Sequence, residues 1–515
     1  MAYFYIGGMR DQLFLMPVSM RDWLEEGHLA WFVIDVVERI DTSPLHVRHP
    51  NDGAGRPAYD PDMMLALLFY AYSTGLRSSR RIEAACRTDA AYRVICGDVT
   101  PDHATIARFL ADHEQAITEV FVQVLALCAA AGLASLGTIA IDGTKIGSDA
   151  ALDRNRTGGW IRTEIEAILA EAAQADAAED ADPQLAAVEQ LPEELSTRTG
   201  RLERLDAALA HIEAQEAAAR AEADQRAATA RKAAAEGRKL PGRKPTDPQA
   251  ALVRAEADET AVRVRTRTRA EARLAGVCDQ AEADGQVRQE TEALVREAVA
   301  ADPEVRRAVT ATAAARAAAD KAAAVDSQAN ITDPESRIMK TATGWIQGFN
   351  AQAAVNEHQV VVACEVSQDH GDVGLYQPMV AATRATLDAA GVTTPIGLVL
   401  ADAGYWSEDN ATAASPDRLI ATIKDWKQRQ AARKLGTTSG DPPDDASPLE
   451  AMEHRLRTEQ GAAAYATRSH TVEPIFAVKT NHDYRRFRRR GLNPARSEWN
   501  LMMTVNNLGK LYRAS

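Results

Sequence analysis

The stretch SLGTIAIDGTK (residues 135–145) passes from small and apolar residues into Asp142, which a glycine follows directly. Asp-Gly pairs are common in turns, so this aspartate taken alone could simply close a strand by bonding its own backbone. The arrangement returns in IGLVLADAGYW, where the apolar run Ile396–Ala401 leads into Asp402 and Gly404 lies two residues further on. The sequence therefore predicts two strands that each end in a carboxylate.

The elements around these two strands follow a definite order. After the first strand comes a long Ala-rich insertion, then a hairpin of two strands, and then a helix over residues 373–390. The strand that ends at Asp402 precedes a helix opened by Ser407, a short apolar strand and a helical C-terminus. Without the insertion, this order predicts an α/β, RNase H-like fold with a mixed five-stranded sheet and flanking helices. The first and fourth strands of such a sheet are neighbours, so Asp142 and Asp402 should meet although 260 positions separate them.

Two neighbouring carboxylates suit hard divalent ions. Magnesium prefers carboxylate oxygens, and two ions about 3.5–4 Å apart can clamp the attacking and leaving oxygens of a phosphodiester displacement. A third carboxylate is then needed, and Glu473 in YATRSHTVEPIFAVKTN (residues 465–481) is the candidate, because its apolar neighbours predict a helix packed on the sheet. Pro474 favours a position near the start of that helix. An ordinary glutamate interacting with the N-terminal helix dipole is the alternative.

Residues 1–134 are predicted to form a helical DNA-binding domain. Apolar residues recur with helical spacing between residues 20 and 130, and Ser78 or Ser79 and Thr100 are predicted helix caps. Short helices, a turn and a capped third helix resemble a helix-turn-helix, with an ordinary helical bundle as the alternative. The basic residues beside this segment are Arg77, Arg80, Arg81 and Arg108.

Between residues 160 and 330 the composition shifts to Ala, Glu, Arg and Asp, with few aromatic residues and long helix-favouring runs. We expect an inserted, coiled-coil-like helical arm between a first-strand segment (135–159) and the rest of the catalytic core with its basic C-terminal segment (331–515). Glycines and prolines within 237–248 predict a reversal that makes the arm an antiparallel hairpin with a basic tip. A solvated spacer is the alternative. A coiled-coil scaffold is disfavoured, because Leu and Val are too sparse for sustained heptads.

Charge and cysteine content narrow the class of protein. The net charge of −14 opposes nucleic-acid binding at first sight, but residues 481–513 hold eight Lys or Arg against two acids, and residues 231–245 hold six against one. Five scattered cysteines without a C-x-x-C pair argue against a disulfide framework and a zinc site. The sequence shows no membrane-spanning apolar run and no signal peptide, which predicts a cytoplasmic protein without a membrane partner.

Four segments, in order along the chain, resemble the insertion-sequence transposases of the DDE class: AIDGTK, DPESRIMKTATGWIQGFNAQ, LVLADAGYWSEDN and YATRSHTVEPIFAVKTNHDYRRFRRRGLNPARSEWNLMMTVNNLGKL. The N-terminal half, from MRDWLEEGHLAWFVIDVV through GRPAYDPDMMLALLFYAYSTGLRSSRRIE to PDHATIARF, is similar to the N-terminal helical domain of that family. The resemblance implies cleavage and transfer of DNA strands with Mg²⁺ or Mn²⁺, two ions in all. It also implies double-stranded DNA as partner, a homodimer, and a bacterial cytoplasmic protein that is nucleoid-associated when bound to DNA.

The resemblance also implies roles for single residues. The catalytic, metal-binding triad would be Asp142, Asp402 and Glu473. Tyr465, Arg468 and Lys479 match a Tyr-Arg-Glu-Lys signature, whose basic groups hold DNA phosphate beside the metals. Four residues separate Arg468 from Glu473 and five separate Glu473 from Lys479, so each gap departs by one from the commoner signature. The arm also follows the first strand, rather than the last strand as in the best-known relatives.

Further DNA contacts are expected from the basic run that follows Glu473, whose arginines would position the phosphate backbone without reading sequence. These arginines are Arg485, Arg486, Arg488, Arg489 and Arg490. Trp406 could stack on an unpaired base or pack into the core. A non-catalytic DNA-binding relic of a transposase is the alternative function. A phosphatase of the haloacid-dehalogenase type is excluded, because Ala140 stands where its nucleophilic aspartate would be.

Overall fold

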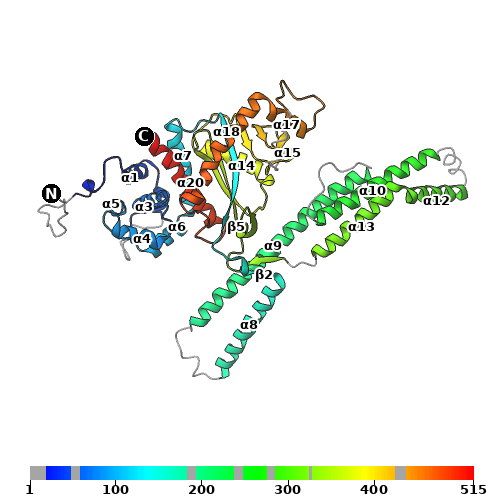
Figure 1. The fold of residues 1–515 in the computed structure, drawn as a ribbon. Helices are drawn as coiled ribbons and strands as arrows, with labels where there is room; N and C mark the ends of the chain where they lie inside the picture. The colour runs from blue at the N-terminus through cyan, green and yellow to red at the C-terminus, as the bar shows by residue number, and fades with distance from the viewer. Residues whose placement is uncertain are drawn as a thin grey trace, which may run out of the picture. The chain divides into compact units, whose positions relative to one another are not determined.

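The computed structural model describes residues 19–47, 58–181, 193–236, 248–274, 285–323, 327–423 and 436–515. The chain divides into two compact units (Figure 1). Unit 1 joins residues 1–154 to residues 335–515, and unit 2 is the segment 155–334 between them. The predicted basic tip at residues 237–247 lies outside the described residues, as does Cys278, whereas the other four cysteines are buried and free.

A mixed sheet forms the centre of unit 1, which makes the fold α/β as predicted. Its strands in the described chain are β1 (Thr138–Gly147), β4 (Arg337–Thr341), β5 (Gly344–Asn356), β6 (Val361–Ser367), β7 (Leu398–Ala401) and β8 (Asp417–Ile420). The order is β4-β5-β1-β7-β8, and β6 also pairs with β5. The predicted hairpin is confirmed, because β5 and β6 pair antiparallel. The described sheet has six strands rather than five, because the stretch before the hairpin also pairs with β5 as β4.

The two neighbours of β1 end at different places. On one side β1 pairs in parallel with β7, and the last pair is Ile141 opposite Ala401. On the other side it pairs antiparallel with β5 as far as Gly147. The predicted contact between the first and fourth strands is thus confirmed. The prediction that the first strand ends at Asp142 is wrong, because β5 still supplies hydrogen-bond partners where β7 has already ended.

Helices cover both faces of this sheet (Figure 1). α14 (Tyr376–Ala389) packs over one face, and α18 (Glu459–Phe476) with α20 (Leu492–Ala514) packs over the other. Successive residues of a strand point to opposite faces, and Ala140 belongs to the core beneath α18 and α20. Asp142, two residues further along β1, therefore faces the side of α18.

Shorter helices complete the C-terminal part of unit 1. They are η2 (Leu152–Arg154), η4 (Val373–Leu375), α15 (Glu408–Thr412), α17 (Pro448–Arg457) and α19 (Val478–Asn481). The predicted helix over residues 373–390 corresponds to η4 continued by α14. The predicted cap of the next helix is confirmed, because the hydroxyl of Ser407 accepts from the amide of Asn410 at 3.0 Å.

The N-terminal helices share a core with the sheet. They are η1 (Met20–Trp23), α1 (Leu29–Arg39), α2 (Ser43–His46), α3 (Pro61–Ser73), α4 (Ser79–Thr88), α5 (Ala90–Ile95), α6 (His103–Asp112) and α7 (Glu114–Ala130). Buried residues of α1 and α3 belong to the same apolar cluster as those of α18 and α20. The cap predicted at Thr100 is wrong: the carboxylate of Asp102 accepts from the amide of Thr105 at 2.9 Å and opens α6. The short carboxylate of Asp102 reaches the third helical amide, as an N-cap requires.

α20 is fastened to the sheet by two buried polar side chains. Trp499 donates from Nε1 to the carbonyl of Gln352 in β5 at 2.9 Å. Asn507 brackets Val361 at the start of β6, accepting from its amide and donating to its carbonyl at 2.8 Å each. These bonds satisfy buried groups that would otherwise lack a partner, so they hold the helix in one position on the sheet.

Unit 2 consists of helices and one short strand pair in its described residues. The helices are α8 (Gly158–Ala181), α9 (Glu193–Ala235), α10 (Pro248–Arg273), α12 (Gly285–Ala301) and α13 (Pro303–Ala323), and the strands are β2 (Asn155–Thr157) and β3 (Gln328–Asn330). Because α10 packs against α9, α12 and α13, the arm is more than the single hairpin predicted. One of its cores consists of Ala230, Ala234 and Ala257, which bury little apolar surface.

Arg77, between α3 and α4, ties the N-terminal helices to the C-terminal part of unit 1. Its side chain is 3% exposed, and its guanidinium donates to the carboxylate of Glu498 in α20 at 3.1 Å. It also donates to the carbonyls of Asp483 (2.6 Å) and Arg486 (3.0 Å), and lies over the ring of Tyr484. Burial raises the pKa of Glu498, and Arg77 acts in the opposite direction. The pair therefore holds the segment before α20 in place.

We predict that Arg77→Met lowers the free energy of unfolding by about 3 kcal/mol, because it leaves Glu498 buried without its partner. Chemical denaturation followed by circular dichroism measures this change. The double variant Arg77→Met, Glu498→Leu should recover part of the loss, since no buried charge remains. Equal stability of Arg77→Met and the parent would show that the buried ion pair does not form.

Candidate active site

Asp142 and Asp402 lie at one edge of the sheet, beside the end of β7. Asp402 follows β7 directly, and its Oδ1 accepts from the amide of Gly404 at 2.7 Å. Asp142 follows the last β1 residue paired with β7, and its Oδ1 accepts from the amide of Gly143 at 2.8 Å. The two apolar strands thus present two carboxylates where their parallel pairing stops.

The negative charges of Asp142 and Asp402 at this edge of the sheet require a nearby cation. The side chain of Asp142 is 20% exposed, and burial raises its pKa. Arg468 acts in the opposite direction, since its Nη1 donates to Asp142 Oδ2 at 2.9 Å, whereas the charge of Asp402 raises the pKa of Asp142 further. Partly buried carboxylate oxygens of this kind fit Mg²⁺ or Mn²⁺ as ligands.

α18 carries the third predicted ligand over the same edge. It packs against β1, β5 and β7. The prediction that Glu473 stands near the start of its helix is wrong, because α18 continues through Pro474 and ends at Phe476. Proline has no amide hydrogen for the carbonyl of His470, and Gln359 Nε2 donates to that carbonyl at 2.7 Å instead. This outside donor makes proline acceptable inside the helix.

Glu473 therefore lies in the last turn of α18. A carboxylate there is not favoured by the helix dipole, so the alternative of an N-terminal glutamate fails. Its side chain is 62% exposed, and its Oε1 lies 3.9 Å from Arg468 Nη2. Arg468 thus reaches both Asp142 and Glu473. In the described part of the chain, the three carboxylates of the predicted triad do not all lie within 4.8 Å of one another.

One tighter group of ligand atoms occurs in the described ranges, on the N-terminal helices. It consists of His46, Asp60 and Asp62, whose ligand atoms lie within 4.8 Å of one another. Asp60 caps α3 by accepting from the amide of Asp62 at 3.0 Å, and Asp62 contacts His46 Nε2 at 2.9 Å. Helix capping and an exposed pair account for this group.

Tyr465 and Lys479 flank the same edge. The hydroxyl of Tyr465 donates to the carbonyl of Ala401, the residue before Asp402, at 3.2 Å. Lys479 Nζ donates to Thr144 Oγ1 at 2.9 Å and to the carbonyl of Lys145 at 3.0 Å, both beyond Asp142 on β1. Burial, and then the charge of Arg485, lowers the pKa of Lys479. The members of the signature thus meet along one short length of β1 and β7.

The basic run divides into paired and unpaired arginines. Arg489 pairs with Glu114 of α7, and Arg490 pairs with Asp149 at 3.2 Å. Arg485 is exposed, with Asp483 at 3.8 Å. The exposed side chains of Arg486 and Arg488 make no ion pair with any described residue. The run also adds to the sheet edge, because the amide of Phe487 donates to the carbonyl of Gly147 and the amide of Gly147 donates to the carbonyl of Arg485.

The N-terminal arginines lie on packed neighbouring helices. Arg80 and Arg81 stand in the first turn of α4, Arg108 stands on α6, and α4 packs against α6. All three are exposed and have no ion-pair partner in the described chain. Trp406, in contrast, is half-buried and packs against the cores on both faces of the sheet. This packing favours the core role for Trp406.

The sequence analysis missed a group of polar side chains close to the two aspartates. They are Lys145, Asn350, Gln352, Asp372 and Tyr405, and their hydrogen bonds connect them to one another. Asn350 and Gln352 are fully buried in β5. Their signal in the sequence is the alternation Asn-Ala-Gln inside an apolar strand, because buried amides are costly without partners.

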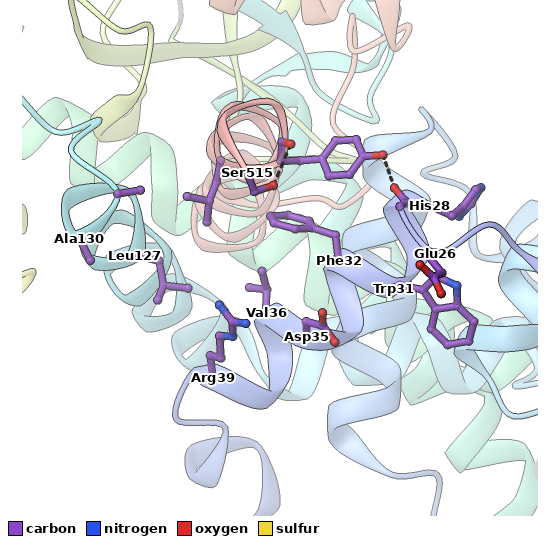
Figure 2. A pocket seen from close by; sticks show the side chains of 14 residues that line it. Glu26, His28, Trp31, Phe32, Asp35, Val36, Arg39, Leu127, Ala130 and Ser515 are labelled. Carbon is purple, nitrogen blue, oxygen red and sulfur yellow. Dashed lines mark hydrogen bonds between the residues drawn. The ribbon is translucent and has the colours of Figure 1, made fainter. Parts of the chain in front are cut away.

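A cavity of about 750 Å³ lies elsewhere in unit 1, between α1, α7 and the end of α20 (Figure 2). Trp31 and Phe32 of α1 line it together with Leu127 of α7. The hydroxyl of Tyr512 closes one side by donating to the carbonyl of Gly27 at 2.7 Å. None of the predicted site residues lines this cavity.

Comparison with known families gives two matches. Residues 18–112 match the family described as Transposase domain (DUF772), and residues 427–512 match the family described as Transposase DDE domain. The second match includes Glu473 and the basic run, but neither Asp142 nor Asp402. No curated protein and no solved structure matches the chain. No helix in the described residues has the length and apolarity needed to cross a membrane.

The two matches define the class of protein as a transposase, a class that acts on DNA. Their order along one chain, an N-terminal transposase domain and a C-terminal DDE domain, supports an insertion-sequence transposase of the DDE class. The expected family is therefore confirmed.

We predict that Arg468→Gln lowers the free energy of unfolding by about 2 kcal/mol at pH 8, because Asp142 loses its charged donor while it stays largely buried. The loss should shrink as the pH falls through the folded pKa of Asp142, which is raised, since a neutral carboxyl needs no cation. Denaturant titrations at pH 8 and pH 4.5 test both statements.

The control is Arg455→Gln, which removes an arginine from an exposed pair with Asp417 and should cost less than about 1 kcal/mol at either pH. If Arg468→Gln behaves like this control at pH 8, the pairing of Arg468 with Asp142 is refuted.

Proposed function

We propose that this transposase binds the ends of an insertion sequence, cleaves DNA strands there and transfers them to target DNA. Asp142, Asp402 and Glu473 are its proposed ligands for two divalent ions, Mg²⁺ or Mn²⁺. The observation that carries this proposal is the parallel pairing of β1 with β7, which brings Asp142 and Asp402 to one edge of the sheet from positions 260 residues apart. The match of residues 427–512 to a transposase DDE domain supports it.

The sheet supports an RNase H-like catalytic core. β6, β5 and β1 are successive antiparallel neighbours, and β7 and β8 continue the sheet in parallel with β1. This is the mixed arrangement expected from the element order, with β4 as an additional strand. This arrangement places Asp142 and Asp402 close together in space although they are far apart in the sequence. A site built from two strands requires such proximity.

Bound divalent ions would activate the attacking oxygen and stabilise the leaving oxygen of the phosphodiester. Asp142 and Asp402 offer carboxylate oxygens from the rigid sheet. Glu473 is exposed on α18 and would join them by turning away from Arg468. Nη2 of Arg468 would then be available for a DNA phosphate, while Nη1 stays on Asp142. Lys479, held against β1, adds a second positive charge beyond Asp142. The proposed chemistry needs no covalent bond between protein and DNA.

Exposed arginines support a binding surface for double-stranded DNA. Among the arginines predicted to contact DNA, five are exposed and make no ion pair with a described residue: Arg80, Arg81, Arg108, Arg486 and Arg488. Arg77 links the two groups in space, because it precedes α4 and bonds the carbonyl of Arg486. Arg489 and Arg490 already neutralise acids of the protein and are weaker candidates for phosphate contacts. Two element ends must be joined, so the active complex is proposed to be a homodimer.

We predict that Asp142→Ala, Asp402→Ala and Glu473→Ala each reduce cleavage by about a hundredfold or more, as removal of a group that stabilises transition-state charge does. The substrate is a supercoiled plasmid with candidate element ends, incubated with Mg²⁺ or Mn²⁺, and nicked and linear products are quantified. Binding to the ends, measured by gel shift, should persist in all three variants.

The matched control is Glu459→Ala, which removes an exposed glutamate from the first turn of the same helix as Glu473 and should leave cleavage unchanged. Unchanged cleavage by Glu473→Ala would instead show that another residue is the third ligand. DNA binding without cleavage by the parent would favour the non-catalytic relic.

We predict that Arg486→Ala and Arg488→Ala each lower the slope of log K against log salt for DNA binding by about one, because each removes one phosphate contact. Arg490→Ala is the matched control, since its guanidinium already pairs with Asp149, and it should change the slope less. Fluorescence anisotropy with a labelled duplex across several salt concentrations gives the slopes. Equal effects of the three variants would contradict the division into paired and unpaired arginines.

A further inference from the structure

A network of buried polar side chains lies beneath the two aspartates, on the opposite face of β1. Gln352 and Asn350 of β5 stand beside Gly143 and Lys145 of β1 in the antiparallel register, so all four share one face. Both amides are fully buried. A Cβ on Gly143 would lie 2.0 Å from Gln352 Nε2, so only glycine leaves room for this amide. The glycine after Asp142 is therefore required by packing in the strand, not by a turn.

The network converges on Asp372, the residue before η4. Its Oδ1 is held by three donors: Asn350 Nδ2 at 2.8 Å, Gln352 Nε2 at 3.2 Å and Lys145 Nζ at 3.2 Å. The buried hydroxyl of Tyr405 donates to Gln352 Oε1, which turns the amide nitrogen toward Asp372. One oxygen of this carboxylate is thus fixed from three sides.

The other oxygen of Asp372 points toward Asp402. A Cβ on Gly404 would lie 2.8 Å from Asp402 Oδ1 and 3.1 Å from Asp372 Oδ2, so both oxygens border the same small space. Asp372 Oδ2 accepts no hydrogen bond from any described residue, and the side chain is 26% exposed. Burial of Tyr405 raises its pKa, and the charges of Asp372, Asp142 and Asp402 all add to this effect. The negative charges of three aspartates therefore act on one buried hydroxyl.

A purely structural role would account for Oδ1 alone, as the partner of Lys145 and the two amides. It does not account for Oδ2 beside a second carboxylate, because neighbouring like charges raise the free energy unless a cation lies between them. Fixing one oxygen while leaving the other open toward a second carboxylate is the way proteins orient a metal ligand.

We propose that Asp372 is a further carboxylate of the cation site, oriented by Lys145, Asn350 and Gln352 to bind a divalent ion together with Asp402. This inference rests on the proposed function, because it adds a ligand to the site of Asp142, Asp402 and Glu473. The proposal also explains why residue 404 is a glycine, since a side chain there would separate the oxygens of Asp372 and Asp402.

The test is titration of the full chain with Mn²⁺, followed by electron paramagnetic resonance of the free ion and by calorimetry without DNA. Asp372→Asn keeps the shape and the hydrogen bonds to Oδ1 while it removes the charge. We expect it to weaken binding of one Mn²⁺ about tenfold or more, the loss typical of an altered metal environment. The matched control is Asp369→Asn, an exposed acid three residues earlier whose side chain contacts Ser367 and should leave binding unchanged.

Gly404→Ala provides a second variant that retains all four carboxylates. Its methyl group should push Asp372 and Asp402 apart and weaken the same Mn²⁺ binding, with a circular dichroism spectrum like that of the parent. Mn²⁺ affinities of Asp372→Asn and Gly404→Ala equal to that of the parent would overturn the role of Asp372. If the parent cleaves DNA and loses Mn²⁺ binding with Asp402→Asn but not with Asp372→Asn, the inference alone fails. If the parent binds no Mn²⁺, the inference and the metal-dependent function fail together.

Discussion

The parallel pairing of β1 with β7 is the constraint on which the rest of the site depends. Its hydrogen bonds end at Ile141 and Ala401, so the next residue of each strand, Asp142 or Asp402, emerges at one edge of the sheet. The neighbouring elements at this edge are arranged around the partly buried carboxylates of Asp142 and Asp402. α18 brings Arg468, and the loop after β7 brings Gly404. Because a buried pair of like charges needs compensation, the pairing of the strands also sets the charges of the neighbouring elements.

Two arginines pair with buried carboxylates of unit 1, at different depths and at different places. Arg77 is almost completely buried and holds Glu498, so it acts as part of the core and fixes the basic run before α20. Arg468 lies at the rim, pairs with Asp142 and approaches Glu473. The deeper pair can only be broken at a large free-energy cost, whereas the rim pair exchanges with solvent, ions or phosphate more easily. This difference is consistent with the proposed DNA-binding surface, held rigidly by Arg77, next to the proposed metal site.

The sequence predicted the sheet better than the environment of each side chain. The element order gave the strand neighbours, because hydrophobic runs and hairpin spacing are local signals. The length of β1 was not predictable from the Asp-Gly pair, since β5, a distant segment, supplies the partners beyond Asp142. Proline in the last turn of α18 was equally misleading, because the donor that makes it acceptable comes from Gln359. The sequence predicts DNA contacts for Arg489 and Arg490 from their charge, but it does not show that Glu114 and Asp149, from distant segments, pair with them.

The sequence by itself determined the class of protein, the two strands with carboxylates and the basic run after Glu473. These are properties of residue order, and a chain carries them before it folds. The tertiary structure alone decided which of the arginines predicted to contact DNA have acidic partners, and that Asp372 stands beside Asp402. The physical reason is that such relations depend on contacts between segments tens to hundreds of residues apart. Local periodicity and residue spacing carry no information about these contacts. Gly143 and Gly404 are examples. In the sequence each glycine indicates a turn, and only the packing in the structure explains why a glycine is required at each position.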